Sequence, residues 1–405
     1  MMESESQGTM DPPLKGIKVL DFGQVYQGPY ATYLMAQAGA DVIKIEAPTG
    51  EPLRQREIRG GSAIFQMGML NANKRAITID LKTEQGKQLL RDLVPHMDIL
   101  LENFTPGVMD RLGVGAASLQ KINPRLIYAS GTGYGLSGPD KDAMAMDITV
   151  QAMSGIMSVT GEDGGPPVRV GPAIADFMGG IHLYSAVMTA LYERERTGIG
   201  RLVEVSMLES VYPTLASGLG AMYDNGGEIP PRPGNRGALN TAPYSVFEAA
   251  DGYVSIFCLK ENHWTNLCNA MGRPELATDS RFATSEARAK NLELTEQMVT
   301  EWSSKLPKDE VFRVLCEHRI PAAPVRTMKE VSNSEHMFAR DSLQKLDHPD
   351  LGMVTLPSSP LRYHGTPQTQ LTASPRLGQH NQEVFAELLG LSSDQVDQLH
   401  ADGAI

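Results

Sequence analysis

The chain has 405 residues, of which 41% are hydrophobic. That content is enough to bury one large core or two moderate ones, and the length favours two or three domains. The formal net charge is −12, which argues against a nucleic acid or an anionic membrane surface as the main partner, although a local basic pocket could still hold phosphate groups.

The cysteines and the N-terminus bear on the compartment. Cys258, Cys268 and Cys316 are an odd number without CxxC spacing, which argues against a disulfide framework or a zinc knuckle and favours a reducing compartment. No stretch approaches roughly 18 consecutive apolar residues, and the start Met1–Ser6 is acidic and polar. We therefore expect a cytoplasmic protein without a membrane span, a signal peptide or a transit peptide.

The first part of the chain alternates short β-branched runs with helical patterns. Strands are predicted over residues 17–22, 42–46, 76–80, 99–102 and 126–131, and helices over residues 30–38 and 84–94. Strands and helices that alternate at this rhythm predict a parallel α/β sheet. The segment Gly131–Gly135 follows a strand, but no helix pattern comes after it, so it is not a dinucleotide-binding fingerprint.

Asp176 is a lone acid among small residues, just before an apolar run. The run from Ile181 to Tyr192 has apolar residues at helical spacing, so Asp176 falls near a helix N-terminus. There we expect the carboxylate to stay ionised, close to backbone N–H groups that also favour anions. On position alone, two interpretations stay open: a helix-capping aspartate without chemistry, or a carboxylate that meets a substrate.

The composition changes after Ala221. The Gly- and Pro-rich segment Gly226–Gly237 predicts a linker or an active-site loop. Beyond it, strands are predicted over residues 245–247 and 253–257, helices over 263–271, 291–304 and 308–318, an extended stretch over 349–361, and helices over 382–389 and 393–400. The resulting division is a tail (1–13), a large α/β domain (14–220), a linker and active-site loop (221–240), a small α+β domain (241–335) and a C-terminal segment (336–405).

Short motifs follow one another along the chain in a characteristic order. They include Gly39–Glu46, Asn71–Arg75, Glu102–Gly107, Arg111–Gly113, Asn123–Ile127, Thr197–Gly200, Ala242–Tyr244, Ile320–Pro324 and Leu377–Asn381. In this order they resemble the family III CoA-transferases, the group that includes formyl-CoA:oxalate and carnitine CoA-transferases. The resemblance covers nearly the whole chain from about Leu14. It implies a large Rossmann-like parallel-sheet domain, a smaller α+β domain, a C-terminal segment that returns to the large domain, and two protomers interlinked like rings.

The resemblance implies that Asp176 is a covalent nucleophile. Moving coenzyme A between two acids requires a nucleophile that conserves the thioester energy, and a carboxylate does so as a mixed anhydride. Asp147 stands where formyl-CoA transferases carry a second acid, which could orient hydrogen-bond donors or repel hydroxide; an aspartate at a helix start is the alternative. No metal and no tightly bound cofactor is expected, because coenzyme A enters as part of the acyl-CoA substrate.

Other positions match family residues that contact coenzyme A or the transferred acids. The CoA-binding matches are Val25, Ile79 beside the adenine, Lys82, Asn103 and Arg111, and the substrate-proximal matches are Tyr26, Gln27, Gly237, Asn240 and Thr241. Each of them alone has a plain alternative as a surface charge or a turn residue. A family arginine that would fall at Ala47 is missing, so the phosphate contacts must differ in part.

Two other functions stay open. Racemases of the same fold superfamily use a His just before the acid that matches Asp147, and Met146 cannot accept a proton there, so a 2-methylacyl-CoA racemase or epimerase is disfavoured. His182 is expected to pack or cap rather than to act as a base. The second alternative is a non-catalytic CoA-binding subunit of a heteromeric transferase, against which the retained Asp176 argues. We expect a homodimer, with a heteromer of related subunits as the alternative, and no nucleic-acid or membrane partner.

One loop departs from the pattern of the oxalate-using relatives. Those relatives close the site with four glycines followed by Gln, whereas this chain has Gly237-Ala-Leu-Asn-Thr241. Ala and Leu restrict the backbone and add apolar side chains. We therefore expect an acceptor acid larger than oxalate, with a hydrocarbon body.

Overall fold

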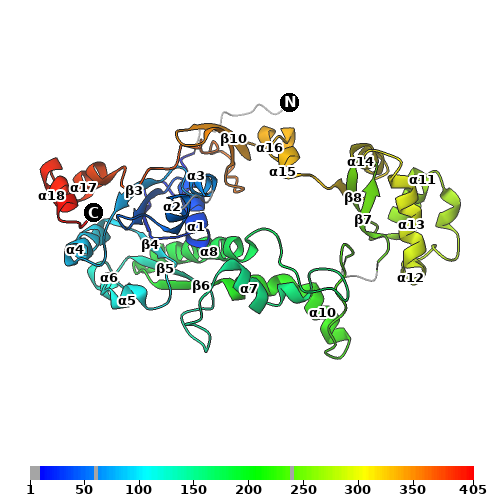
Figure 1. Ribbon diagram of the computed structural model, residues 1–405, viewed down its shortest axis with the longest axis horizontal. Coiled ribbons are helices and arrows are strands. Elements are labelled where there is room, and N and C mark those ends of the chain that lie inside the picture. Colours follow the sequence, from blue (N-terminus) through cyan, green and yellow to red (C-terminus); the bar gives the residue numbers. More distant parts are fainter. Residues whose placement is uncertain (1–9, 59–62, 238–240) are drawn as a thin grey trace. The chain divides into compact units, whose positions relative to one another are not determined.

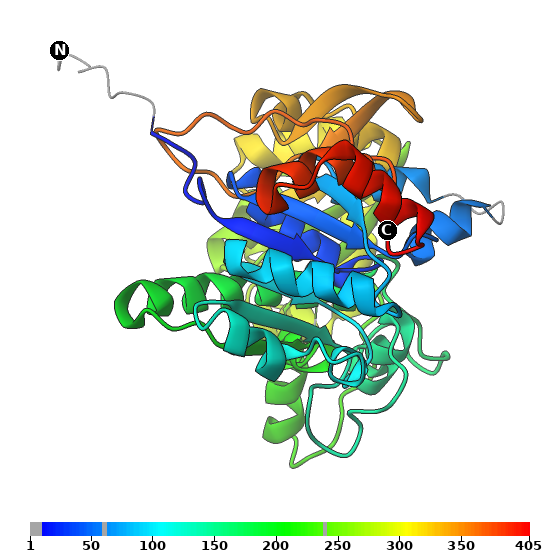
Figure 2. The same ribbon diagram turned by 90° about the vertical axis from the view of Figure 1, so that its left-hand side faces the viewer.

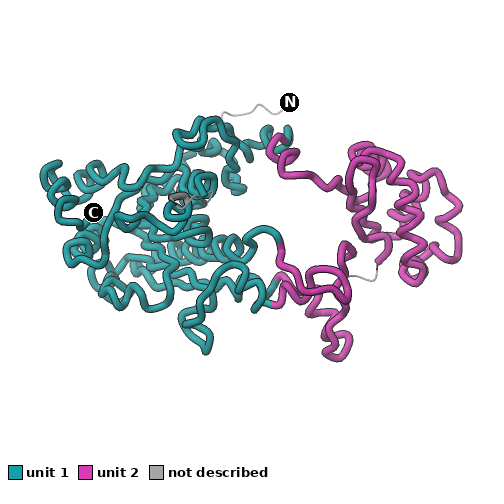
Figure 3. The backbone as a smooth tube through the Cα atoms, viewed as in Figure 1, with its two compact units in different colours: residues 1–154, 171–213, 334–405 teal, residues 155–170, 214–333 magenta. Residues whose placement is uncertain are grey.

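The structure is a computed structural model that describes residues 10–58, 63–237 and 241–405. It divides into two compact units: unit 1 contains residues 1–154, 171–213 and 334–405, and unit 2 contains residues 155–170 and 214–333 (Figure 3). Residues 155–170 thus group with unit 2, although the predicted large domain ran without a break from 14 to 220. Hydrogen bonds explain this grouping, because Gly234 N–H donates to the Gly161 carbonyl and Arg232 Nε donates to the Glu162 carbonyl.

The described part of unit 1 centres on a six-stranded parallel sheet in the order β3-β2-β1-β4-β5-β6 (Figure 1). Its strands are β1 (Lys18–Asp21), β2 (Asp41–Glu46), β3 (Arg75–Thr78), β4 (Ile99–Glu102), β5 (Ile127–Thr132) and β6 (Leu202–Ser206). The five strands predicted in this region are confirmed. The sequence did not predict β6, since this edge strand is largely exposed and lacks a long apolar run.

The helices of unit 1 cover both faces of this sheet. They are α1 (Gln27–Gln37), α2 (Pro52–Ile58), α3 (Ile64–Leu70), α4 (Glu84–Leu93), α5 (Val108–Arg111), α6 (Ala116–Ile122), α7 (Asp147–Met153), α8 (Ile174–Thr197), α9 (Met207–Val211), α16 (Glu335–Ala339), α17 (Asn381–Leu389) and α18 (Ser393–Ala401). Neighbouring strand residues point to opposite faces. Val19 packs in one core with Met35 of α1 and Val187 of α8, whereas Leu20 packs in another with Leu90 of α4.

The C-terminal segment returns to unit 1, as predicted, and covers the free edge of β3. Figure 2 shows its red helices beside the blue strands. His380 Nδ1 accepts a hydrogen bond from Ala76 N–H at 3.0 Å, and Asn381 Oδ1 accepts one from Thr78 N–H at 2.9 Å. Phe385 of α17 is fully buried in the core under β3. An edge strand covered in this way is not open to pairing with another chain.

The C-terminal segment also contains a hairpin of β10 (Leu343–His348) and β11 (Gly352–Pro357), which precedes α17. The sequence predicted a single extended stretch over residues 349–361, so it found the second strand and missed the first. The reason lies in β10 itself, where exposed and partly buried residues alternate between two buried ends.

The described part of unit 2 is α+β, as predicted. Its strands β7 (Tyr244–Ala249), β8 (Gly252–Phe257) and β9 (Ala322–Pro324) form an antiparallel sheet. Its helices are α10 (Ala216–Asp224), α11 (Glu261–Ala270), α12 (Ser285–Lys290), α13 (Leu292–Ser303), α14 (Lys308–Glu317) and α15 (Met328–Val331). Trp264, Phe282 and Val254 lie at the centre of its hydrophobic core.

Among the described residues, one helix, α8, is long and apolar enough to cross a membrane by length and composition. Its residues Leu183, Val187 and Ala190 are buried in the core on one face of the sheet. A core helix passes the same length and composition test, so α8 is weak evidence for a membrane span.

Candidate active site

Asp176 lies in the first turn of α8, the position that the sequence predicted. It does not cap its own helix, since the N-cap residue is Ala173. Asp147, the first residue of α7, takes over that role. Its Oδ1 accepts a hydrogen bond from Ala175 N–H at 2.8 Å and from Asp176 N–H at 3.4 Å. The interpretation of Asp176 as a capping aspartate is therefore wrong, and Asp147 is both a helix-start residue and the cap of α8.

The surroundings of Asp176 change its charge state. Burial, and then the negative charge of Asp147, raise the pKa of the Asp176 carboxyl to about 7. Burial and the charge of Asp147 thus outweigh the effect expected of a helix start, and the carboxyl is present in both its protonated and its ionised form near neutral pH. A carboxyl with a pKa near neutrality in a partly buried position is typical of functional sites.

Asp147 is itself fixed from its own helix. Its Oδ2 accepts a hydrogen bond of 2.7 Å from Nε2 of Gln151, one helical turn later, and Gln151 is fully buried. Gln151 was not among the site residues predicted from the sequence. Its spacing of four residues after an acid was the available signal, because such pairs face each other on a helix.

Gln27 and Tyr26 lie at the start of α1, next to α8. Gln27 is only 2% exposed, and its Nε2 donates to the Thr132 carbonyl at 3.4 Å. A Cβ added at Gly179 would lie 2.8 Å from Gln27 Nε2, so this glycine lets the side chain lie against α8. The Tyr26 ring lies 5.9 Å from the Phe177 ring. The structure therefore brings two of the five predicted substrate-proximal residues, Tyr26 and Gln27, next to the helix that carries Asp176.

Phe177, which directly follows Asp176, was also missed by the sequence analysis. Its ring packs edge-on against Tyr30 at 4.8 Å between ring centres. With Tyr26 it forms an aromatic group beside the acid. Aromatic rings in this arrangement hold one another in place.

A cavity of about 360 Å³ lies where the first strands of the sheet end. It contains three of the predicted CoA-binding residues, and its full lining is Phe22, Gln24, Ile45, Glu46, Ala47, Gly50, Glu51, Ile79, Asp80, Leu81, Lys82, Phe104, Val108, Arg111 and Leu112. The strand order reverses between β1 and β4, and in open α/β sheets ligands bind in the crevice at that point. The position and the lining both make this cavity the candidate site for coenzyme A.

The other two predicted CoA-binding residues do not line the cavity. Asn103 accepts a hydrogen bond from Gln24 N–H at 2.7 Å and donates one to the Gln24 carbonyl at 3.0 Å. Val25 N–H donates to Oε2 of Glu51 at 2.9 Å. Val25 therefore belongs to the loop between β1 and α1, whose Gln24 lines the cavity, and Asn103, just after β4, binds this loop. Glu51 lines the cavity and was not predicted from the sequence.

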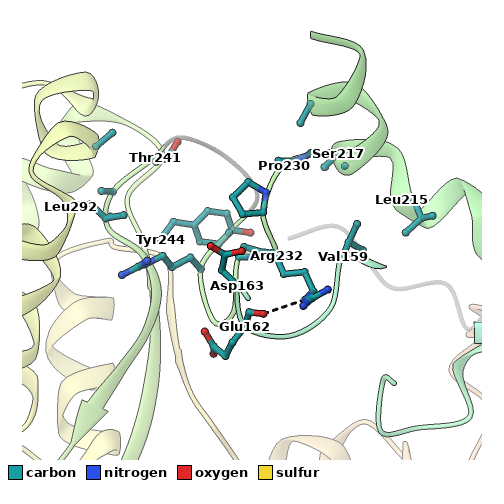
Figure 4. Close-up of a pocket in the computed structure, with 18 of the residues that line it drawn as sticks. Val159, Glu162, Asp163, Leu215, Ser217, Pro230, Arg232, Thr241, Tyr244 and Leu292 are labelled. Atoms are coloured by element: carbon teal, nitrogen blue, oxygen red, sulfur yellow. Dashed lines mark hydrogen bonds between the residues drawn. The ribbon is translucent and has the colours of Figure 1, made fainter. Parts of the chain in front are cut away.

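The predicted loop residues Gly237 and Thr241 line a different cavity, of about 540 Å³, in unit 2 (Figure 4). Asn240 lies outside the described residues, as do Ala238 and Leu239. The arginines of this cavity already have partners, since Arg232 donates to the Glu162 carbonyl at 3.2 Å and Arg236 pairs with Glu296 at 2.9 Å.

Two further features concern alternative chemistry. His182 lies on α8, and its Nδ1 is 2.8 Å from the Met178 carbonyl of its own helix. In the described residues, no group of three or more His, Cys, Asp or Glu side chains is arranged to hold a metal ion.

The chain is similar to known proteins along nearly all of its length. Residues 14–381 match the model of CoA-transferase family III. The chain is 39% identical to the formyl-CoA:oxalate CoA-transferase of Streptomyces avermitilis, with 98% of this chain and 100% of the relative covered. It is 36% identical to the succinyl-CoA–D-citramalate CoA-transferase of Chloroflexus aurantiacus, with 97% and 98% covered. A crystal structure of a CaiB/BaiF family protein from Brucella suis superimposes with a TM-score of 0.83 at 32% identity, over 94% of this chain and 100% of that one.

Proposed function

The chain belongs to CoA-transferase family III, and from this premise we propose that Asp176 forms covalent intermediates as coenzyme A passes from an acyl-CoA to an acceptor carboxylic acid. The observation that carries the proposal is the position of Asp176: a partly buried carboxyl in the first turn of α8, with a pKa near neutrality. Such a group is deprotonated in a large fraction of molecules at neutral pH and is poorly solvated, which favours nucleophilic attack.

The first half of the reaction transfers coenzyme A to the enzyme. A carboxylate oxygen of Asp176 attacks the carbonyl carbon of the donor thioester, the C–S bond breaks, and the products are an aspartyl-acyl anhydride and CoA thiolate. The thiolate then attacks the aspartyl carbonyl carbon. The bond to the donor acyl oxygen breaks, so the donor leaves as a carboxylate and Asp176 becomes a CoA thioester.

The second half repeats these steps with the acceptor. The acceptor carboxylate attacks the aspartyl-CoA carbonyl carbon and releases the thiolate, which gives a second mixed anhydride. The thiolate attacks the acceptor acyl carbon and releases Asp176 as a free carboxylate. No proton, electron or metal is needed for the balance, but water must be kept away because hydrolysis of either anhydride would lose the thioester energy.

The cavity at the strand ends supports binding of the nucleotide half of coenzyme A. Lys82 and Arg111 offer two positive charges to its phosphates, while Ile79, Phe22 and Phe104 offer apolar surface to the adenine. Ala47 lines the same cavity without a charge, so the phosphates have fewer basic partners than the family pattern provides.

Racemisation is not supported by the residues at the site. Met146, at the N-cap of α7, stands in place of the base, and His182 is bonded to the carbonyl of its own helix. Incubation with a 2-methylacyl-CoA in deuterated water should give no enzyme-dependent α-deuteration. Rapid exchange would contradict the transferase mechanism.

The assembly and the compartment also belong to the proposal. We expect a cytoplasmic homodimer with interlinked chains, because family members resemble this chain along its full length. Light scattering should then give twice the chain mass of 44.0 kDa at low concentration. A stable and active monomer would contradict this part.

The nucleophile is tested by substitution and trapping. Asp176→Ala should abolish CoA exchange between acyl-CoA and carboxylic acids, as monitored by mass spectrometry. Its affinity for CoA should stay close to that of the wild type. Asp142→Ala, at an exposed acid in the loop before α7, is the control and should keep full turnover. Hydroxylamine added during turnover should convert Asp176 into a hydroxamate. Substantial turnover by Asp176→Ala, or failure to trap Asp176, would overturn the assignment.

A further inference from the structure

The loop between β1 and α1 is held by side chains through five consecutive backbone groups. Gly23 N–H donates to Asp21 Oδ1 at 2.8 Å, and the Gly23 carbonyl accepts from Lys44 Nζ at 2.9 Å. Both backbone groups of Gln24 bind Asn103. Val25 N–H donates to Glu51 Oε2 at 2.9 Å. Each of these backbone groups has a side-chain partner, so contacts with side chains fix the loop.

Val25 needs this support because of its backbone conformation. Its φ is 62°, in the left-handed region that β-branched residues rarely adopt. The other non-glycine residues with positive φ in the described chain are Asn73, Arg319 and Asp341, none of which is β-branched. A strained residue persists only where its surroundings hold it, and such residues cluster at functional sites.

The group that holds Val25 is half of a buried ion pair. Glu51 Oε1 lies 2.9 Å from Lys44 Nζ, and the two side chains are 2% and 0% exposed. Lys44 thus binds the loop at Gly23 and Glu51 binds it at Val25. Burying two charges is costly, and apolar residues of the same size often stabilise a fold as well or better. The pair binds the loop at Gly23 and at the strained Val25 itself, which gives a reason for its presence other than stability.

We propose that Glu51, supported by Lys44, is a positioning residue that holds Val25 in its left-handed conformation and thereby shapes the coenzyme A cavity. The inference rests on the proposed function. Gln24 lines the cavity immediately before Val25, and Tyr26 and Gln27 follow it at the start of α1. Relaxation of Val25 to an ordinary φ would shift Gln24 out of the cavity wall and change where α1 begins.

A double-mutant cycle tests this role, with the dissociation constant of free CoA measured by calorimetry. Glu51→Ala should weaken CoA binding about tenfold or more, since a hydrogen bond to a charged group is lost. The direction of the change in CoA affinity is informative. A carboxylate that only faced the CoA phosphates would repel them, so its removal would tighten CoA binding. In a Val25→Gly background, where positive φ is unstrained, the same substitution should cost less than about threefold.

Controls separate positioning from general stabilisation. Asp341→Gly also relieves a positive φ, of 51°, but far along the chain from the cavity, so Glu51→Ala in that background should still cost about tenfold. If Glu51→Ala does not fold, Glu51→Met keeps a similar side-chain volume, removes both acceptor oxygens and carries the same cycle. Three results would each overturn this inference without touching the proposed function. These are an equal loss of CoA affinity in the Val25→Gly and wild-type backgrounds, rescue of CoA affinity by Asp341→Gly, and no loss of CoA affinity in Glu51→Ala. A wild-type protein that binds no CoA would overturn the proposed function with it.

Discussion

Asp147 caps the helix that carries Asp176: its Oδ1 lies 3.4 Å from the Asp176 backbone nitrogen and 2.8 Å from that of Ala175. One acid therefore fixes the position of the other and at the same time opposes its ionisation, because the charge of Asp147 contributes to the raised pKa of Asp176. The two effects can be separated, since an asparagine at position 147 keeps an acceptor oxygen and loses the charge.

The first prediction concerns the pH dependence of transfer. Asp176 must be deprotonated to attack, so kcat/KM of the wild type should rise with pH and level off above about pH 7. Asp147→Asn should move this rise to lower pH, which increases the ratio of the rate at pH 6 to the rate at pH 8. Asp142→Asn removes an exposed acid and should leave the profile unchanged. An unmoved rise in Asp147→Asn would show that Asp147 does not influence Asp176.

The second prediction concerns stability. The pKa of Asp176 is raised from 3.8 to about 7 on folding, so between these pH values the native state holds more protons than the unfolded state. Stability is therefore lost as pH rises through this window. Asp176→Asn lacks this loss, so its free energy of unfolding at pH 8 should exceed that of the wild type by about 1–3 kcal/mol. The difference should be smaller at pH 5. Urea unfolding at both pH values measures it.

A second buried acid provides the comparison. Burial raises the pKa of Glu102, at the end of β4, to about 7 as well. The stability advantage of Glu102→Gln over the wild type should therefore also grow as the pH rises. Glu102→Gln should keep turnover, whereas Asp176→Asn should lose turnover. A pH-independent effect of Asp176→Asn would mean that the carboxyl is not desolvated in the native state.

The sequence predicted what depends on local pattern. Apolar runs located the strands β1 to β5, and the acid before a helical run located Asp176. Family motifs also placed Ile79, Lys82 and Arg111, which the fold brings into one cavity from two different strand ends. These residues are separated in sequence but follow strands β3 and β4 of one sheet, and parallel topology puts the ends of both strands at the same edge.

What the sequence could not predict depends on contacts between distant segments. The pKa of Asp176 depends on burial and on Asp147, 29 residues earlier, and a helix start alone gave the opposite expectation. The role of Glu51 depends on the φ of Val25, which no residue pattern indicates for a β-branched side chain. Strand β6 was not predicted, because an exposed edge strand has no strong apolar pattern.

The third prediction separates phosphate recognition from the rest of CoA binding. Lys82→Ala and Arg111→Ala should each raise KM for an acyl-CoA by about tenfold, because each removes a charged contact to phosphate. With the corresponding acyl-pantetheine, which has no nucleotide, the same variants should match the wild type. Lys87→Ala, on α4 and already paired with Glu84 at 2.6 Å, is the control. Equal losses with both substrates would show that Lys82 and Arg111 do not contact the nucleotide.

The last prediction concerns the acceptor acid. A Cβ added at Gly237 would lie 1.9 Å from the Tyr244 ring, so a glycine is required there by close contact. Ala238 and Leu239 follow it in the sequence, where the family resemblance implies glycines in oxalate-using relatives. Apolar side chains favour acids with a hydrocarbon body by roughly 0.8 kcal/mol per buried methylene, or about fourfold in kcat/KM. An acid with a longer hydrocarbon body, such as succinate, should therefore be a better acceptor than oxalate. Replacing Ala238 and Leu239 by glycine should narrow the difference, whereas Ala250→Gly, in the turn between β7 and β8, should not. A clear preference of the wild type for oxalate would contradict this interpretation of the loop and leave the role of Asp176 untouched.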